Sequence, residues 1–336
     1  MEYRILGRTG LNVSVLGVGM WQLSGPLSLD GKADGFPDVG KDKAIALIHA
    51  CGDLGINFID AAEIYGGGEG ERRVGEAIRG YRDRWIVSTK FGVRRGSNGE
   101  RITNAQPDTI RASLENSLKR LQTDYVDIYL YHCEPDSHAI AEGKEVLDTL
   151  KQEGKLRFYG ISTDNPTMLS QMVDRNAVDV VMFNQSLVTH PSELLDLVKK
   201  HNLGTIIRGA LEAGLLSGKY FQQNPQFSAQ DVRQQNLKLV DFQQYRVYKK
   251  FLPEGVSMTA FALRYLLDLD STHTIALGGK SIEQYRDALG AIELPPLEPN
   301  THEALQKVRQ QLLNPSLGQK ILNRVGRLTR QFVKMR

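Results

Sequence analysis

The sequence is poor in the residues that build disulfide-bonded or metal-held frameworks. Its 336 residues include two cysteines, Cys51 and Cys133, too few for a disulfide framework or a cysteine-based zinc site. The seven histidines show no His-x-His or His-Glu-x-x-His spacing, which argues against a metal-dependent barrel hydrolase. Scarce cysteine is typical of a reducing compartment, so we expect a cytoplasmic protein without a metal site.

Long apolar runs and a strong excess of one charge are also missing. No apolar run approaches the roughly 20 residues of a membrane-spanning helix, and the residues after Met1 do not resemble a signal peptide. The formal net charge is +3, but the last 17 residues hold six basic side chains and no acidic one. The rest of the chain is mildly acidic and has no basic stripe, so we expect no nucleic-acid partner.

Short apolar segments alternate with amphipathic helical ones along most of the chain. The expected strands are Val15–Gly19, Asn57–Asp60, Trp85–Lys90, Val126–His132, Phe158–Ser162, Val180–Asn184, Thr205–Arg208 and Thr274–Leu277. The expected helices are Asp42–Leu54, Gln106–Leu121, Ala139–Gln152, Asn165–Arg175, Ser192–His201 and Ser281–Ala291. Eight such strands predict the α/β class and a closed (β/α)₈ TIM barrel, with an open doubly wound sheet as the alternative.

Three segments fall outside this alternation. Tyr3–Ser14 reads as an N-terminal β-hairpin that could plug the bottom of the barrel. Gly218–Gly255 is too long for an ordinary loop, and we expect it to carry a polar helix around Asp231–Lys250 and to lie over the active site. We therefore divide the chain into a barrel, residues 1–296, and a helical C-terminal extension with a basic end, residues 297–336.

Ionisable side chains close three consecutive predicted strands. Asp60 ends the second strand with Tyr65 just beyond it, Lys90 ends the third, and His132 ends the fourth. In a barrel these ends share one mouth, and pairing Lys90 with Asp60 would offset the cost of burying either charge. We expect Lys90 to lower the pKa of Tyr65, and His132 can donate a hydrogen bond to a carbonyl oxygen. This set predicts carbonyl reduction with Tyr65 as the acid.

Each of these residues also has a purely structural interpretation. Asp60 could cap the following turn, Tyr65 could be a half-buried loop aromatic, and His132 could be a buried histidine with satisfied hydrogen bonds. Their common position at adjacent strand ends favours the catalytic interpretation.

The motifs Asn57-Phe58-Ile59-Asp60, Tyr65-Gly66 and Ser88-Thr89-Lys90, together with His132, resemble the aldo-keto reductase superfamily. The resemblance covers roughly residues 1 to 295. It implies a barrel that binds NADPH without a Rossmann domain, hydride transfer to the carbonyl carbon, and protonation of the oxygen by Tyr65. It further implies that Asp60 pairs with Lys90 and that His132 orients a small carbonyl substrate. Potassium-channel β subunits share this fold, so a regulatory module that binds cofactor remains the alternative.

The same resemblance implies the cofactor-binding residues. They are Met20, Trp21, Asp60, Ser162, Thr163, Gln185, Arg208, Gly209, Leu211, Lys219, Gly278, Lys280, Gln284 and Asp287. Thr163 replaces a usual asparagine, Gln284 a frequent arginine, and Arg208 a stacking aromatic. We expect NADPH rather than NADH, because Lys280 and a helix N-terminus suit a phosphate. The positive charge of Arg208 should disfavour NADP⁺ relative to NADPH.

The substrate and any further partner are less defined. The segment Ser24–Gly40 carries Asp30, Asp34 and Asp38, which favours a polar, uncharged or cationic substrate. In the tail, Ile321, Val325, Leu328 and Phe332 recur at helical spacing among basic residues. This pattern fits a helix docked on the barrel, or an amphipathic helix that binds an anionic membrane or an acidic partner. The oligomeric state stays open.

Overall fold

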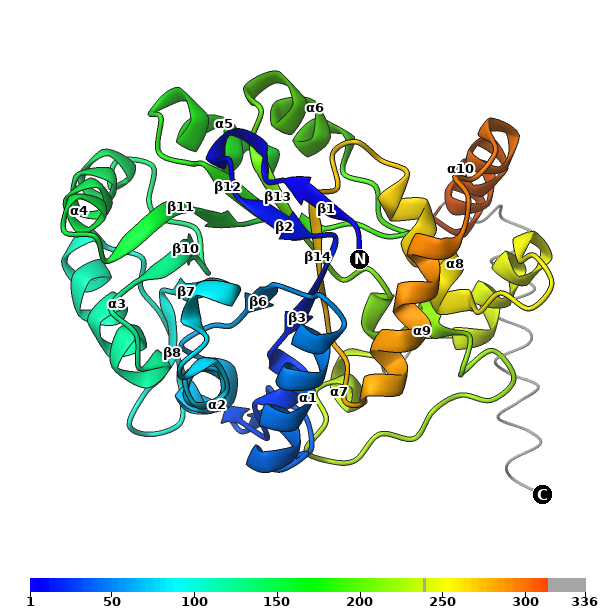
Figure 1. Ribbon diagram of the computed structural model, residues 1–336, viewed down its shortest axis with the longest axis horizontal. Coiled ribbons are helices and arrows are strands. Elements are labelled where there is room, and N and C mark those ends of the chain that lie inside the picture. Colours follow the sequence, from blue (N-terminus) through cyan, green and yellow to red (C-terminus); the bar gives the residue numbers. More distant parts are fainter. Residues whose placement is uncertain (238–239, 314–336) are drawn as a thin grey trace.

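A closed parallel barrel forms the centre of the computed structural model, which describes residues 1–237 and 240–313 (Figure 1). Going around the barrel, each strand pairs with the next one in the chain, and β14 pairs with β3. The strands are β3 (Leu16–Gly19), β6 (Phe58–Asp60), β7 (Ile86–Phe91), β10 (Val126–Tyr131), β11 (Leu156–Ser162), β12 (Val180–Asn184), β13 (Gly204–Arg208) and β14 (Thr274–Leu277). The predicted (β/α)₈ barrel is confirmed, and all eight predicted strands overlap the observed ones.

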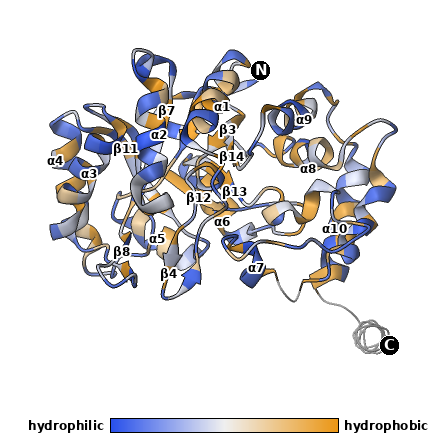
Figure 2. Cartoon of the chain, turned by 90° about the horizontal axis from the view of Figure 1, so that it is seen from below, coloured by the Kyte–Doolittle hydropathy of each residue, from blue (hydrophilic) through white to orange (hydrophobic). Residues whose placement is uncertain are grey.

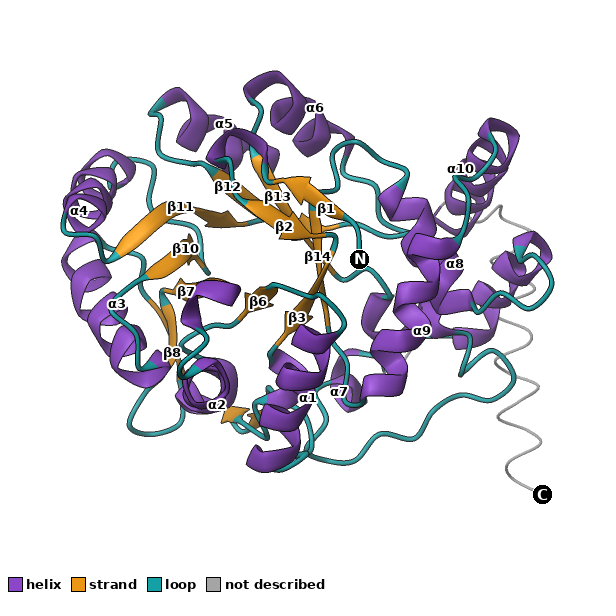
Figure 3. Cartoon of the chain, viewed as in Figure 1, coloured by secondary structure: helices purple, strands orange, loops and turns teal. Residues whose placement is uncertain are grey.

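A ring of helices surrounds the barrel (Figure 3). It comprises α1 (Lys41–Asp53), α2 (Glu69–Ile78), α3 (Pro107–Leu121), α4 (Ile140–Gln152), α5 (Pro166–Asp174), α6 (Ser192–His201), α8 (Met258–Leu267) and α9 (Ile282–Glu293). Local sequence fixes several starts: Pro107 and Pro166 occupy first-turn positions, and the Asn165 side chain accepts from the amides of Thr167 and Met168. These helices carry both hydrophilic and hydrophobic residues, as an amphipathic outer layer requires (Figure 2).

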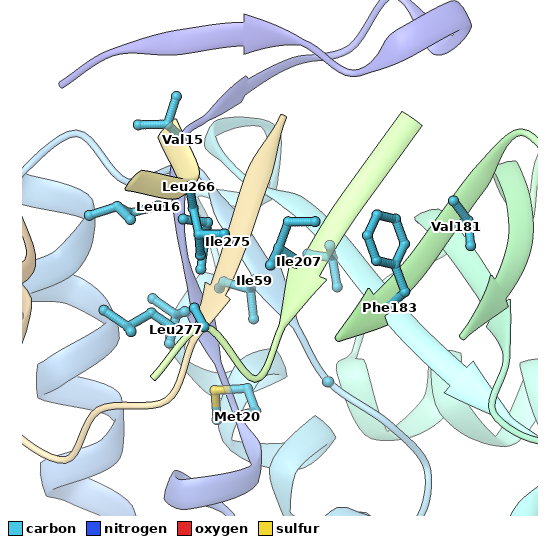
Figure 4. Packing of buried hydrophobic residues seen from close by; sticks show 14 of the residues in the cluster. Val15, Leu16, Met20, Ile59, Val181, Phe183, Ile207, Leu266, Ile275 and Leu277 are labelled. Carbon is cyan, nitrogen blue, oxygen red and sulfur yellow. The ribbon is translucent and has the colours of Figure 1, made fainter. Parts of the chain in front are cut away.

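Apolar side chains on the two faces of the strands form separate clusters. One lies between strands and helices and includes Ile207, Ile275 and Leu277 (Figure 4). The other fills the barrel interior, where Phe58, Ile128 and other strand residues meet Leu6 of the N-terminal hairpin. The alternation of side chains along a strand produces this division.

The N-terminal hairpin closes the bottom of the barrel, as predicted. Its strands are β1 (Tyr3–Ile5) and β2 (Asn12–Ser14), and its interior residues Leu6, Leu11 and Val13 belong to the inner cluster. Gly7 has φ +48°, and a Cβ there would lie 2.4 Å from the backbone of Leu203 and Gly204. Only glycine lets the turn approach β13 this closely.

Two small hairpins and a long insertion lie at the opposite end. The hairpins are β4 (Ser28–Leu29) with β5 (Lys32–Ala33), and β8 (Val93–Arg95) with β9 (Arg101–Thr103). In the insertion, the predicted polar helix over Asp231–Lys250 is wrong. The segment instead forms the short helix α7 (Arg233–Asn236) and a 3-10 helix, Phe242–Phe251, and Phe242 at the start of the second packs against Tyr220 and Phe227.

The described chain ends with α10 (Pro299–Leu313), which packs on the barrel side through Leu305 and Val308. The apolar and basic residues of the predicted tail helix lie outside the described residues. No helix within the described ranges is long and apolar enough to cross a bilayer.

Candidate active site

Strand register brings Asp60 and Lys90 to the same face of the barrel. Asp60 on β6 pairs with Ser88 on β7, and Lys90 lies two residues further along, so its side chain points the same way as that of Ser88. Thr89, between them, points outward and donates a hydrogen bond to buried Glu71 on α2 over 2.6 Å. The predicted pair therefore follows from the period of two along a strand.

Lys90 contacts both Asp60 and Tyr65. Its Nζ lies 2.7 Å from Asp60 Oδ2, donates to the carbonyl of Ala61 over 2.7 Å, and donates to Tyr65 OH over 3.3 Å. The side chain of Lys90 is 1% exposed. Tyr65 occupies the first position of a 3-10 helix, Tyr65–Gly68, which turns it back over β7.

His132 lies against the other side of Tyr65. The two rings are 5.7 Å apart and nearly perpendicular, and Trp21 stacks on Tyr65 with centroids 6.0 Å apart. The backbone amide of His132 donates to Phe91 on β7, which fixes the position of the residue. The Nδ1 atom of His132 is buried and has no hydrogen-bond partner among the described residues.

Burial and local charge set the protonation states. Burial, reinforced by Lys90 and Arg208, lowers the pKa of His132 well below its usual value, so the imidazole is neutral. Lys90 lowers the pKa of Tyr65, as expected, but burial raises it by more, so the pKa of Tyr65 lies above its ordinary value. Burial alone would lower the pKa of Lys90, but the Asp60 carboxylate raises it, so the amine stays charged.

A cavity of about 1000 Å³ opens above the four residues. Besides the four, it is lined by most of the residues expected to bind cofactor: Met20, Trp21, Ser162, Arg208, Gly209, Leu211, Lys219, Gly278, Lys280, Gln284 and Asp287. One cavity thus contains both the candidate catalytic residues and the candidate cofactor residues.

Two expected cofactor residues do not line this cavity. Thr163 is 3% exposed; its hydroxyl donates to Glu134 over 2.6 Å and accepts from the backbone amide of Asn165, the N-cap of α5, over 3.0 Å. Gln185 is fully buried, and neither its amide oxygen nor its amide nitrogen has a partner among the described residues.

The comparisons with known proteins agree with this geometry. The family model described as the aldo/keto reductase family matches residues 15–310. This chain belongs to the aldo-keto reductase family. It is therefore an oxidoreductase of a family that reduces carbonyl compounds with a nicotinamide cofactor.

Individual relatives differ in what their names say. An uncharacterised oxidoreductase of Bacillus subtilis is 31% identical over 317 residues, covering 93% of this chain and 97% of the relative. A probable voltage-gated potassium channel subunit beta of rice (Oryza sativa subsp. japonica) is 29% identical, covering 92% and 97%. The holo form of an aldo-keto reductase from Bacillus halodurans superposes with a TM-score of 0.77 at 29% identity, covering 92% of this chain and 96% of the other.

The polar atoms of this aldo-keto reductase site fit a nicotinamide cofactor. Buried amide groups are normally hydrogen-bonded, and the amide of Gln185, which directly follows the lining residue Asn184, has no partner among the described residues. Gly209 has φ +69°, and a Cβ there would lie 2.6 Å from Asn184 Oδ1, so the backbone is bare where a pyrophosphate could approach. Within the described ranges, no group of three or more His, Cys, Asp or Glu residues is arranged to hold a metal ion.

Arg208 is paired in a way that the sequence did not reveal. Its guanidinium donates to Asn184 Oδ1 over 2.7 Å and to Asp164 Oδ2 over 2.8 Å. Asp164 therefore offsets part of the charge that we expected to act on the nicotinamide ring. The position of Asp164, just beyond the end of β11, carried no sequence signal for this role.

The acidic residues of Ser24–Gly40 do not form a free acidic surface, so the basis for expecting an uncharged or cationic substrate is wrong. Asp38 pairs with Arg73 over 2.8 Å, and Asp34 pairs with Arg101 over 2.7 Å. Asp30 Oδ1 accepts a hydrogen bond from the backbone amide of Arg101.

Sequence reasoning also missed several side chains at the mouth. Phe36 is 3% exposed and contacts Trp21 edge-on at 5.2 Å, while Arg233 and Lys280 lie over its ring at 5.3 and 5.0 Å. Arg101 lines the cavity from β9. The contacts of Phe36 join three loops that are far apart in the sequence, so no local pattern could have indicated them.

Proposed function

We propose that this protein reduces small aldehydes or ketones with NADPH and that Tyr65 is the general acid. The observation that carries the proposal is the position of Lys90 Nζ, 2.7 Å from Asp60 and 3.3 Å from the Tyr65 hydroxyl, beside the neutral ring of His132. This arrangement offers a proton, a positive charge to stabilise the phenolate that remains, and a hydrogen-bond donor for the substrate oxygen.

The bound cofactor supplies the hydride that the carbonyl carbon accepts. As negative charge develops on the carbonyl oxygen, His132 donates a hydrogen bond to it, and Tyr65 OH transfers its proton to it. The alcohol forms, and the Tyr65 phenolate is stabilised by the ammonium of Lys90 until a proton returns from solvent. Asp60 keeps Lys90 charged and in place. Trp21, stacked on Tyr65, excludes water from one side of the reacting group.

The preference for NADPH is supported by positive charge where the cavity reaches the start of α9. Lys280 precedes α9, and its backbone amide donates to Gln284 Oε1 over 2.7 Å, which orders the turn. The amine of Lys280 and the N-terminus of α9 together suit a 2′-phosphate. Lys219 adds a further cation to the lining.

The test is cofactor oxidation at 340 nm over a panel of aldehydes, with NADPH and NADH in parallel, for wild type and Tyr65→Phe. We expect wild type to prefer NADPH. Tyr65→Phe should lose at least ~10²-fold in kcat while it still binds the cofactor, since general acid catalysis contributes about that much. Tyr220→Phe is the matched control, because Tyr220 also lines the cavity but its ring packs on Phe227 and Phe242, so this variant should keep the wild-type kcat.

The regulatory alternative predicts a different result. A module of the potassium-channel β type would bind NADPH tightly and turn over no aldehyde of the panel. Equal turnover by wild type and Tyr65→Phe would instead refute the role of Tyr65 and leave the reductase activity standing.

A further inference from the structure

The cavity lining is more cationic than acidic. Its charged residues are Lys90, Arg101, Arg208, Lys219, Arg233 and Lys280 against Asp34, Asp60, Glu212 and Asp287. Most of these cations already have a function in the fold or lie on segments expected to bind the cofactor. Lys90 is held by Asp60, Arg208 by Asp164, and Arg233 by Asp231.

Arg101 is linked through Asp34 to Trp21, the side chain that stacks on Tyr65. Its Nη2 lies 2.7 Å from Asp34 Oδ1, and the backbone carbonyl of Asp34 accepts a hydrogen bond from the Trp21 indole over 3.2 Å. Trp21 in turn stacks on Tyr65. The charge of Arg101 also contributes to the lowered pKa of His132, so its field reaches the reacting end of the cavity.

The guanidinium of Arg101 has unused hydrogen-bonding capacity. Asp34 takes one of its terminal nitrogens, and Nε and Nη1 have no hydrogen-bond partner within residues 1–237 and 240–313. The side chain is 39% exposed, so its remaining N–H groups are open to a ligand. A guanidinium N–H group donates a charge-assisted hydrogen bond to a carboxylate or a phosphate.

We propose that Arg101 determines specificity by binding an anionic group, a carboxylate or a phosphate, of the carbonyl substrate. The carbonyl lies at Tyr65 and His132, and the anionic group lies several bonds away, beyond Trp21. This inference rests on the proposed reductase function and narrows its substrates to aldehydes or ketones with a negatively charged end. It replaces the expectation of an uncharged or cationic substrate.

A second account of the same contact is purely structural. The hairpins β4–β5 and β8–β9 touch through Asp30, whose amide donates to the carbonyl of Gly99, and the Asp34–Arg101 pair could serve only to hold them together. The two accounts make opposite predictions for Asp34→Asn. If Arg101 binds an anion, Asp34→Asn removes the competing carboxylate and strengthens binding of the substrate. If the pair only holds the hairpins together, replacing either Asp34 or Arg101 weakens that contact and lowers the activity on the substrate.

The test uses the full chain with NADPH and two aldehydes of the same skeleton and different charge, 4-carboxybenzaldehyde and its neutral methyl ester. The readout is the ratio of kcat/KM for the acid to that for the ester. A second pair, glyceraldehyde 3-phosphate and glyceraldehyde, tells phosphate from carboxylate. Arg95→Gln is the matched control, because Arg95 lies on the same hairpin, bonds to the carbonyl of Ser28, and does not line the cavity.

We expect Arg101→Gln to lower the acid-to-ester ratio about tenfold, the size of a partly exposed charge-assisted hydrogen bond. Arg95→Gln should keep the wild-type ratio, and Asp34→Asn should raise it through a lower KM for the acid. An unchanged ratio in Arg101→Gln, or a lowered ratio in Asp34→Asn, overturns the inference while the reductase activity stands. Failure of wild type to reduce any of the four aldehydes refutes the proposed function, and this inference with it.

Discussion

Replacing Lys90 by methionine should destabilise the fold as well as abolish activity. The amine is almost fully buried and contacts Asp60, the Ala61 carbonyl and Tyr65. Its removal leaves the Asp60 carboxylate buried without its cation, which costs about 3–5 kcal/mol. Asp60→Asn in the same chain removes that unpaired charge, so the double variant should be more stable than Lys90→Met alone. We expect a coupling free energy of about 2 kcal/mol.

The measurement is guanidinium chloride unfolding at neutral pH, followed by circular dichroism, for wild type, both single variants and the double variant. Lys151→Met is the control, because Lys151 forms a loose 3.7 Å pair with Asp179 and its side chain is 42% exposed, so its loss should cost at most about 1 kcal/mol. Additive effects of Lys90→Met and Asp60→Asn, within about 0.5 kcal/mol, would refute the reasoning.

Three further predictions concern charge. Burial raises the pKa of Glu63 to about 7, so its contribution to the free energy of unfolding is fully present below the ordinary pKa of a glutamate and is lost as pH rises through 7. Glu63→Gln can still accept the hydrogen bond from the Gly92 amide, so the free energy of unfolding of this variant should differ less between pH 5 and pH 8 than that of wild type. Arg208→Tyr should strengthen NADP⁺ binding relative to NADPH, and an unchanged ratio of dissociation constants by fluorescence titration would contradict this. Lys280→Gln should weaken NADPH about tenfold and NADH little, and equal losses for both cofactors would argue against a phosphate contact.

Most of the barrel could be predicted because its periodicity is local. The strands end on chemistry-bearing residues, and a period of two places Asp60 and Lys90 on one face without any knowledge of the rest of the fold. The helices α2 and α8 escape prediction from the sequence for physical reasons. α8 is buried along its whole length and so lacks an amphipathic pattern, and α2 begins directly after three glycines.

The parts of the site that could not be predicted depend on contacts between distant loops. Phe36 contacts side chains from three loops, and Arg101 of the β8–β9 hairpin forms an ion pair with Asp34, which follows the β4–β5 hairpin. The direction of the Tyr65 pKa shift could not be predicted because the sequence indicates the nearby Lys90 but not how deeply the phenol is buried. The loss of water around the Tyr65 phenol arises only when the loops at this end of the barrel have come together.

The plug at the barrel bottom has a consequence for synthesis of the chain. Arg8 donates its backbone amide to the carbonyl of Asn202, and Arg4 bonds to the carbonyls of Leu267 and Thr272. These partners of the hairpin are synthesised only roughly 190 to 270 residues later, and such long-range closure is slow. Until then the apolar side chains of Leu6, Leu11 and Val13 stay in contact with solvent, because the barrel interior that buries them is not yet complete.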